Sequence, residues 1–512
     1  MKQPAVYLIG AGPGDPRLIT VYGRDCLRSA DVVVYDHLVP QRLLREAHAN
    51  AELIDVGTAT PQPMAQEAIS YLVAEKAREG KRVARLKCGD PFVFDRGAEE
   101  ALFLHEHGIP FEVVPGIAPG ISAPAYAGVP VSYPGAGDTI TLLRGYEDDN
   151  RVPPDVDWPS LIRLDGTVVC QASTQQLPHI LESLRDHGYG ADAQAVLIYN
   201  STLPDQETLS GTIAELLDMI GEQPRRKAAT LVVGRVVGFR DHLRWFDARP
   251  LFGRRILVTR PHQQAADLVD RLAALGADTV EAPVIRIVPP EDRAPLLQAA
   301  AAPDAFDWIV FTSVNAVEAF MAALCEGDRD VRMLKGPRLC TVGPGTAEKL
   351  ADYGIKVDLI PNEFRAEGVV QAMARTGSLD GARVLLPRAD IGREVIAEGL
   401  RHAGAAVTDV VAYRTIAVDA LPDTDPDVYR MLLEGRIDVV TFTSASAVRS
   451  FARICGADQA ADLLKNTVVA VIGPSTADAA RQLGIPVAVQ PQTFTIAALV
   501  DAIVAYYADV KR

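Results

Sequence analysis

The chain has 512 residues, of which 48% are hydrophobic and 23% charged, a composition ordinary for soluble globular proteins. The formal net charge of −15 argues against nucleic-acid binding, so an anionic ligand must be met by local cations or backbone N–H groups. The cysteines form no C-x-x-C pair and the histidines show no metal-ligand spacing, which predicts no metal site and fits a reducing compartment. The chain opens directly into an apolar strand and has no apolar run long enough to span a bilayer, so we expect a cytoplasmic protein with no membrane partner.

The first predicted strand, residues 6–9, leads into a glycine-rich loop, residues 10–16, with a helix expected after it. Such a loop lets the backbone turn sharply and approach a ligand, and in α/β domains it often binds a nucleotide-like group. The spacing departs from the dinucleotide fingerprint, because Asp15 takes the place of the third glycine and Pro13 lies inside the loop. A plain tight turn therefore stays open as an alternative.

Strands and helices alternate through the rest of this half. We expect strands at 31–38, 52–57, 82–86 and 111–118, and helices at about 64–79 and 98–107. A second glycine-containing loop, 87–97, follows the strand 82–86. This βα alternation predicts an α/β fold with a mostly parallel sheet.

Four motifs in this half recur together in a known family. They are Gly-Ala-Gly-Pro-Gly-Asp-Pro (10–16), Val-Val-Tyr-Asp (33–36), Gly-Asp-Pro-Phe-Val-Phe (89–94) and Val-Val-Pro-Gly-Ile (113–117). In this order they resemble the uroporphyrinogen-III C-methyltransferases of the tetrapyrrole methylase fold, over about residues 4–247. The resemblance implies S-adenosylmethionine bound between two α/β lobes, methyl transfer to two pyrrole carbons of a tetrapyrrole, and a possible homodimer through this half.

The same resemblance assigns roles to single residues. Asp36 is similar to the family's proposed proton acceptor, and a cap at the strand end is its alternative role. A positioned base of this kind is what the chemistry requires, because a proton must leave after the pyrrole carbon has attacked the methyl group. The residues matched to the cofactor-lining positions are Pro13, Cys88, Gly89, Asp90, Val93, Ala118, Pro119 and Ala172.

Most departures from the family pattern fall on the substrate side. Thr58 stands where the family has a lysine proposed as proton donor, and Ala59 completes the loss of a basic pair. Other departures are Tyr133, Pro134, Tyr146 and Ser201. Each charge-assisted bond lost from a polyanionic substrate removes roughly 1.5–3 kcal/mol. A methylase-like half that binds the cofactor but is inactive, or altered in substrate, therefore stays open.

The stretch 238–255 ends one predicted domain and begins another, because Arg-Pro and Phe-Gly pairs punctuate it. We predict domains over 1–247 and 248–512. The second contains an internal duplication with a period of about 130 residues, much longer than a solenoid repeat. The paired segments are 256–261 with 384–388, 307–317 with 438–448, and 341–347 with 471–477.

The duplicated half resembles uroporphyrinogen-III synthase over about residues 253–508. The resemblance rests on Leu-Val-Thr-Arg-Pro (257–261), two Phe-Thr-Ser loops, Val-Ala-Tyr-Arg-Thr (411–415) and Ile-Gly-Pro-Ser-Thr-Ala (472–477). It implies a bilobed fold with a two-strand hinge, one lobe of about 253–287 plus 417–512 and the other of about 288–416. The linear hydroxymethylbilane would lie between the lobes, lose its hydroxyl and close with its last ring inverted.

Tyr413, at the second hinge crossing, is similar to the residue placed to assist departure of the hydroxyl; packing in the hinge is its alternative role. Hydroxyls and N–H groups at helix N-termini form anion sites, although each Thr or Ser can also be a plain N-cap. The expected substrate-binding residues are Arg260, Thr312, Ser313, Thr346, Thr443, Ser444 and Thr476.

The two resemblances together predict a fused enzyme in which the second half makes uroporphyrinogen III and the first methylates it towards precorrin-2. The destination of the product, sirohaem or cobalamin, stays open. A bilobed tetrapyrrole-binding sensor is a further alternative, since two α/β lobes with a hinge also describe such proteins. The chain shows no DNA-binding or output segment that would favour it.

Overall fold

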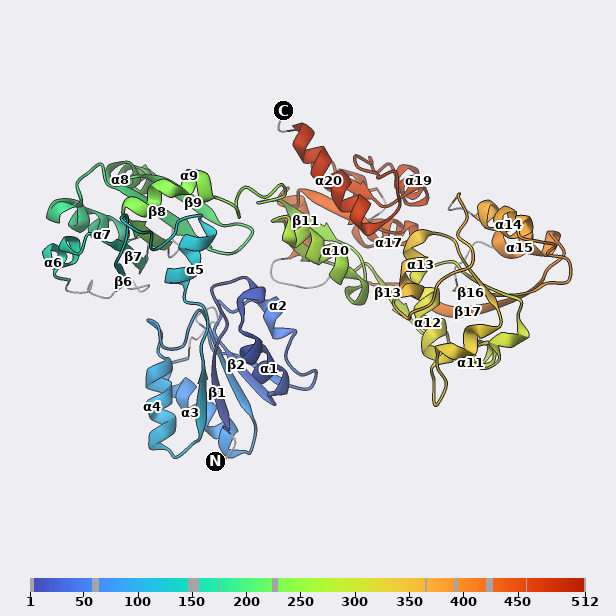
Figure 1. The fold of residues 1–512 in the computed structure, drawn as a ribbon, viewed down its shortest axis with the longest axis horizontal. Helices are drawn as coiled ribbons and strands as arrows, with labels where there is room; N and C mark the ends of the chain where they lie inside the picture. The colour runs from blue at the N-terminus through green and yellow to red at the C-terminus, as the bar shows by residue number, and fades with distance from the viewer. Residues whose placement is uncertain are drawn as a thin grey trace. The chain divides into compact units, whose positions relative to one another are not determined.

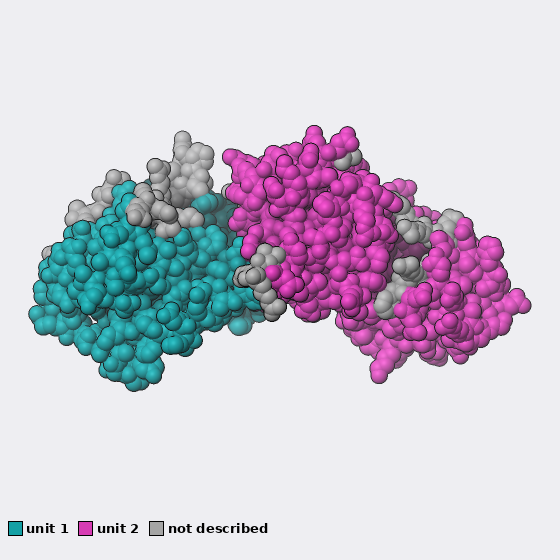
Figure 2. Space-filling view, turned by 90° about the horizontal axis from the view of Figure 1, so that it is seen from above, with its two compact units in different colours: residues 1–253 teal, residues 254–512 magenta. Residues whose placement is uncertain are grey.

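The computed structural model describes residues 4–57, 64–145, 156–173, 175–222, 229–363, 366–390, 395–419, 427–456 and 458–510. The chain divides into two compact units, Met1–Gly253 and Arg254–Arg512, which Figure 2 shows in different colours. In both units helices pack on β-sheets (Figure 1), which confirms the predicted α/β class; the sheets are mostly parallel except in the second lobe of unit 1. None of the helices in the described ranges combines the length and the apolar character needed to cross a membrane.

The first lobe of unit 1 contains β1 (Val6–Gly10), α1 (Val21–Ser29), β2 (Val32–Tyr35), α2 (Gln41–Leu44), β3 (Glu52–Asp55), α3 (Gln66–Arg78), β4 (Val83–Lys87), α4 (Gly97–Glu106) and β5 (Phe111–Val114). Its sheet is parallel throughout, with the order β3-β2-β4-β1-β5. The inner strand β1 is apolar because helices cover both faces: Val6 and Leu8 belong to the core under α3 and α4, and Ile9 to the core under α1.

The second lobe contains α5 (Pro119–Tyr126), β6 (Ile140–Arg144), α6 (Trp158–Arg163), β7 (Thr167–Ala172), α7 (Leu177–Leu184), β8 (Gln194–Tyr199), β9 (Glu207–Thr212), α8 (Ile213–Glu222), β10 (Ala229–Val233) and α9 (Arg240–Leu243). Its sheet has the order β6-β7-β10-β8-β9, with β6 parallel to β7 and the other neighbours antiparallel. Ala123 of α5 packs on Val169 and Val232 of this sheet, so the segment that leaves β5 joins the two lobes.

A buried contact ties the first glycine loop to the second lobe. The backbone N–H of Asp15 donates to Oγ1 of Thr202, 3.0 Å away, in the loop after β8. Thr202 has φ of 69°, which is strained for a β-branched residue. Its own N–H donates to Oε1 of Gln206 at 2.9 Å, and this bond holds it in that conformation.

One lobe of unit 2 contains β11 (Arg255–Val258), α10 (His262–Ala274), β12 (Asp278–Glu281), α16 (Val428–Leu433), β18 (Val439–Phe442), α17 (Ala445–Cys455), α18 (Ala460–Leu463), β19 (Val468–Val471), α19 (Pro474–Gln482) and α20 (Ile496–Val510). Its sheet is parallel, with the order β12-β11-β18-β19. The chain therefore leaves this lobe after β12 and returns to it before α16.

The other lobe contains β13 (Ile285–Val288), α11 (Ala294–Ala301), β14 (Trp308–Phe311), α12 (Val314–Leu324), β15 (Arg338–Thr341), α13 (Pro344–Ala351), α14 (Ala366–Arg375), β16 (Arg383–Ala389), α15 (Val395–His402) and β17 (Ala406–Ala417). The strand order is β13-β17-β16-β14-β15. The long strand β17 pairs in parallel with β16 through Tyr413 and then antiparallel with β13 from Arg414 onward. Both connections to the lobe of unit 2 that contains β11 and β18 thus lie at the β13–β17 pair (Figure 1).

The internal duplication is visible in the cores of the two lobes. In one lobe the rings of Phe311 and Phe320 meet edge to face with centroids 5.5 Å apart, and in the other Phe442 and Phe451 do the same at 5.5 Å. Each pair joins the last residue of a strand, β14 or β18, to the helix that follows it. The repeated sequence therefore forms the same strand–helix unit twice.

Candidate functional site

Three loops of unit 1 meet where neighbouring parallel strands end. The N–H of Gly12, after β1, donates to the carbonyl of Gly89, after β4, at 3.2 Å, and the N–H of Gly89 donates back at 2.7 Å. The N–H of Gly116, after β5, donates to Oδ2 of Asp90 at 3.0 Å. The carboxyl ends of parallel strands are where α/β sheets bind ligands, so these loops form a candidate cofactor site.

The loops approach too closely for side chains at their glycines. A Cβ atom on Gly10 would lie 2.6 Å from the Cα of Gly116, and one on Gly89 would lie 2.7 Å from Cδ of Pro119. Gly89 also has φ of +68°, which L residues with a Cβ rarely adopt. The glycines are therefore required by the backbone packing itself.

The structure brings most of the predicted cofactor residues to these loops: Pro13, Cys88, Gly89, Asp90, Ala118 and Pro119. The carboxylate of Asp90 holds the loops in place by two hydrogen bonds. Its Oδ1 accepts from the N–H of Phe92 at 2.8 Å, and its Oδ2 accepts from the N–H of Gly116. Val93 lies on the same loop as Asp90 and is 37% exposed. Ala172 lies elsewhere, buried at the end of β7 in the second lobe.

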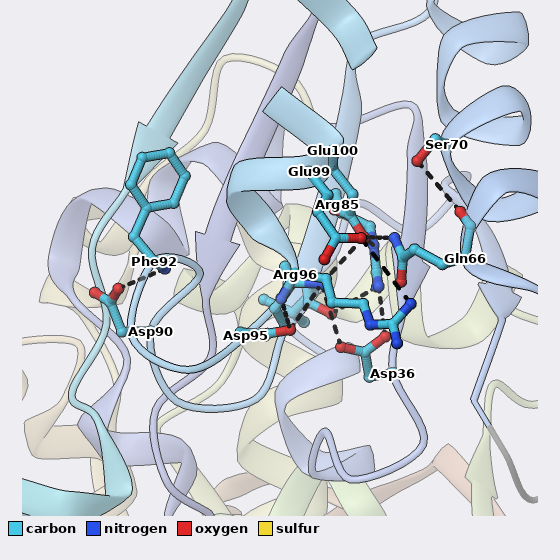
Figure 3. Close-up of polar contacts among 12 residues, drawn as sticks. Asp36, Gln66, Ser70, Arg85, Asp90, Phe92, Asp95, Arg96, Glu99 and Glu100 are labelled. Carbon is cyan, nitrogen blue, oxygen red and sulfur yellow. Dashed lines mark hydrogen bonds and ion pairs between the residues drawn. The ribbon is translucent and has the colours of Figure 1, made fainter. Parts of the chain in front are cut away.

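Asp36 follows β2, and a buried arginine holds it (Figure 3). Nη2 of Arg85, in β4, donates to Oδ1 of Asp36 at 2.6 Å, and Nε donates to Oε1 of Glu100, in α4, at 3.2 Å. Arg85 and Glu100 are at most 2% exposed, whereas the Asp36 side chain is 29% exposed. Arg85 thus holds the carboxylate of Asp36 in place, while part of that carboxylate stays exposed to solvent.

A second buried cation, Lys87 of β4, lies among three carboxylates. Its Nζ is 3.0 Å from Oε1 of Glu100, 3.2 Å from Oδ1 of Asp95 and 3.9 Å from Oδ2 of Asp36. Gln66 also donates to Oε1 of Glu100, at 2.8 Å, while Oε2 of Glu100 has no hydrogen-bond partner among the described residues. Buried charges need such pairing, because desolvation penalises an isolated ion.

The network shifts the pKa values of its acids in opposite directions. Burial by itself raises the pKa of Glu100, but Arg85 and Lys87 outweigh it and hold that pKa below its usual range. For Asp95 burial is the stronger effect, so its pKa is raised even though Lys87 opposes the shift. Glu100 is therefore a fixed anion, and Asp95 is the acid that takes up a proton more readily.

The sequence-based prediction missed this network. The signal was present in β4, where Arg85 and Lys87 interrupt the apolar residues of an inner parallel strand. Such strands are normally continuous apolar runs, and buried Lys and Arg are rare unless paired. Of the substrate-side departures, Thr58, Ala59 and Tyr146 lie outside the described residues.

Unit 2 presents its predicted residues in two matching sets. Ser313 caps α12, its Oγ accepting from the N–H of Ala316 at 3.2 Å, and Ser444 caps α17 in the same way, accepting from Ala447 at 3.2 Å. Both serines therefore have the N-cap geometry that the sequence left open. Thr312 and Thr443 precede them, each half-buried.

Thr346 and Thr476 lie in the first turns of α13 and α19 and are buried. The N-cap residues before these helices are Gly343 and Gly473, which supply no side chain to cap the first N–H groups. Each lobe thus offers two helix N-termini at the carboxyl ends of neighbouring parallel strands, β14 and β15 in one, β18 and β19 in the other. Helix N-termini attract anions.

Tyr413 occupies the point where β17 changes partner. The β16–β17 register shifts between Arg388 and Ala389, and Ala389 pairs with Tyr413. Its hydroxyl lies 3.0 Å from Oγ of Ser313, and burial raises the pKa of the phenol. The neighbouring Asn315 accepts a hydrogen bond from Gln264 of α10, so this corner also connects the lobes.

Arg260 follows β11. Burial lowers the pKa of its guanidinium, with Asp267 and Glu318 opposing the shift. Within the part of unit 2 that the structure describes, Arg260 forms no ion pair, so its charge is available to an anionic ligand. Across all described ranges, no group of three or more His, Cys, Asp or Glu side chains is placed to hold a metal ion.

Comparison with protein families finds two matches. A model described as Tetrapyrrole (Corrin/Porphyrin) Methylases matches residues 5–217, and one described as Uroporphyrinogen-III synthase HemD matches residues 266–501. These matches confirm both families expected from the sequence motifs.

Individual proteins agree with this division. The chain is 34% identical over 503 residues to the porphyrin biosynthesis protein HemD of Ruminiclostridium josui, covering 98% of each chain. It is 41% identical to an S-adenosyl-L-methionine-dependent uroporphyrinogen III methyltransferase of Methanosarcina barkeri, over 46% of this chain and 94% of the relative. A solved uroporphyrin-III C-methyl transferase from Thermus thermophilus, complexed with S-adenyl homocysteine, is 33% identical over 46% of this chain and 98% of its own, with a TM-score of 0.40. The chain therefore belongs to the porphyrin biosynthesis family that joins a tetrapyrrole methylase domain to a uroporphyrinogen-III synthase domain.

Proposed function

We propose that this polypeptide catalyses two consecutive reactions. Unit 2 cyclises hydroxymethylbilane to uroporphyrinogen III, and unit 1 methylates that product with S-adenosylmethionine towards precorrin-2. The observation that carries the proposal is the match over 98% of both chains to a porphyrin biosynthesis protein, with one family model in each unit. Both substrates are polyanionic tetrapyrroles.

Tyr413 acts as the acid of the cyclisation. The C–O bond of the hydroxymethyl group breaks, and the oxygen takes the phenol proton and leaves as water. The exposed carbon bonds to the substituted α-carbon of the terminal ring. The bond from that α-carbon to its existing methylene bridge then breaks, the bridge carbon bonds to the free α-carbon so that the ring is inverted, and the proton released from that carbon restores the phenol. Burial keeps the phenol protonated at neutral pH, since it raises the pKa.

The helix N-termini and Arg260 orient the bilane. Carboxylates are stabilised by N–H groups at helix N-termini and by an arginine, and the paired loops provide such sites on both lobes. Thr312, Ser313, Thr346, Thr443, Ser444 and Thr476 place hydroxyls at the same four positions. Holding the chain bent supplies most of the acceleration, because orientation removes the entropy of bringing the two ends together.

In unit 1 the three loops suit S-adenosylmethionine. Their junction is formed by backbone groups of Gly12, Gly89 and Gly116 and by the carboxylate of Asp90. Pro13, Cys88, Gly89, Asp90, Val93, Ala118, Pro119 and Ala172 would hold the cofactor, which supplies an electrophilic methyl group without a metal. Asp36 accepts the proton that leaves the methylated tetrapyrrole, and Arg85 orients its carboxylate.

One assay tests both reactions. The full-length protein is incubated with hydroxymethylbilane and methyl-labelled S-adenosylmethionine without oxygen, and products are separated by isomer and by label. Labelled type III product is expected. If type III product forms but the label stays on bound cofactor, unit 1 is a cofactor-binding module that transfers no methyl group. If the bilane is consumed no faster than it cyclises spontaneously, the result favours the alternative of a tetrapyrrole-binding sensor.

Two further expectations belong to this proposal. The protein works in the cytoplasm, and it forms a homodimer through unit 1. Light scattering on the full-length protein measures the second, and a monomer at micromolar concentration would contradict it.

A further inference from the structure

The two oxygens of Asp36 face different cations at different distances. Oδ1 is 2.6 Å from Nη2 of Arg85, a short charge-assisted hydrogen bond. Oδ2 is 3.9 Å from Nζ of Lys87, beyond hydrogen-bond length. One cation therefore orients the carboxylate, while the other acts on it only through its charge.

Asp95 determines how much of the Lys87 charge Asp36 feels. The ammonium is 3.2 Å from Oδ1 of Asp95, closer than it is to Asp36. Its other partner, Glu100, shares its Oε1 with Arg85 and Gln66, so it is already compensated. Of the two carboxylates closest to Lys87, Asp95 is thus the one not shared with Arg85.

Counting charges leads to the same residue. Arg85 and Lys87 bring two positive charges, and Asp36, Asp95 and Glu100 bring three negative ones when all are ionised. Two cations cannot neutralise three buried or half-buried carboxylates, so one carboxylate takes up a proton first. Asp95 is that group, because burial raises its pKa and Asp36 raises it further, while Lys87 and the backbone N–H of Arg96 oppose the shift.

We propose that Asp95 is a positioning residue for methyl transfer, whose carboxylate holds the ammonium of Lys87 away from Asp36 and so keeps Asp36 able to accept a proton. The proposal rests on the role given to Asp36 above. When the ring C–H bond breaks, its electron pair stays in the tetrapyrrole and the proton goes to Asp36. A base next to an uncompensated cation is weaker, and a weaker base removes this proton more slowly.

The first test separates methyl transfer from proton loss in Asp95→Asn. Full-length protein is given uroporphyrinogen III and labelled S-adenosylmethionine without oxygen; the label reports the methyl group, and the longer conjugation of the product reports the lost proton. We expect proton loss to slow about three-fold or more, with methyl transfer and cofactor affinity unchanged. Asp95→Glu restores the charge and should restore the rate. Glu106→Gln, on the exposed end of the same helix α4, is the matched control.

The pH profile gives a readout that a merely structural role would not move. In the wild type, protonation of Asp95 frees the charge of Lys87 to act on Asp36, so the rate of proton loss falls as the pH drops through the Asp95 titration. Asp95→Asn is fixed in that slow state and lacks this fall. Identical profiles for wild type and Asp95→Asn overturn the proposal.

A titration without turnover keeps this proposal distinct from the proposed function. The carboxyl carbons of Asp36 and Asp95 are followed by ¹³C NMR in the full-length protein and assigned from the Asn variants. We expect Asp36→Asn to lower the midpoint of Asp95, because it removes a facing negative charge. An unmoved midpoint overturns the coupling. A moved midpoint in a protein that transfers no methyl group supports the coupling and contradicts the proposed methylation.

Discussion

At the scale of single residues, the sharpest expectation concerns Tyr413. Replacing it by Phe removes the hydroxyl that lies 3.0 Å from Ser313 and leaves the ring that packs in the core. We expect formation of the type III isomer to slow at least several-fold, because no acid then meets the departing hydroxyl. The rate is measured by resolving the type I and type III products over time.

The controls for Tyr413→Phe separate chemistry from folding. Tyr429→Phe removes a hydroxyl from an exposed ring on α16 and should leave the rate unchanged. An unchanged rate in Tyr413→Phe, with its melting temperature intact, would assign the residue to hinge packing.

Site residues that lie inside recurring sequence motifs could be predicted from the sequence. Residues whose role depends on a contact with a distant part of the chain could not. Asp36 and Tyr413 were named because short motifs end on them or contain them. Arg85 lies 49 positions from Asp36, and only the β2–β4 register brings the two side chains together. A linear pattern shows that β4 contains charges; it does not show which carboxylates compensate them.

At the scale of elements, the meeting of the loops after β1, β4 and β5 gives a second prediction. Gly89→Ala places a Cβ 2.7 Å from Cδ of Pro119 at φ of +68°. The backbone alone costs about 1 kcal/mol, and the clash displaces the loop that carries Asp90. We expect a clear loss of S-adenosylmethionine affinity, measured by calorimetric titration.

Gly108→Ala is the matched control for this loop. Gly108 has φ of +67°, almost the same as Gly89, but a Cβ there meets nothing within 4 Å. Both variants therefore have the same backbone penalty and only one has the clash. Equal affinities in the two variants would show that the close approach of the loops is not needed for binding.

The hinge shows how far elements can be predicted from the sequence. The repeated motifs indicated two similar strand–helix units, and the matching pairs Phe311–Phe320 and Phe442–Phe451 confirm that duplication. The change of partner along β17 was not predictable, because it depends on a register shift between Arg388 and Ala389. Register is set by contacts with neighbouring strands, which a single sequence does not contain.

At the scale of the whole molecule, the two units have separate hydrophobic cores. Clusters around β1, β4 and β10 lie in unit 1, and those around β14 and β18 lie in unit 2. A ligand that binds only one folded unit stabilises that unit by mass action. The effect of a cofactor on thermal unfolding therefore reports which unit binds it.

We expect S-adenosylmethionine to raise only one unfolding transition of the full-length protein. At a concentration one hundred times Kd it adds about 2.7 kcal/mol to the unit that binds it. For a unit of this size that is a shift of about 5–10 °C. Differential scanning calorimetry with and without the cofactor measures it, and Gly89→Ala should reduce the shift while Gly108→Ala should not.

A cofactor shift that survives in Gly89→Ala, or that affects both transitions equally, would place the binding site away from the three loops. A shift confined to one transition and abolished by Gly89→Ala would assign cofactor binding to unit 1, whether or not the methyl group is transferred.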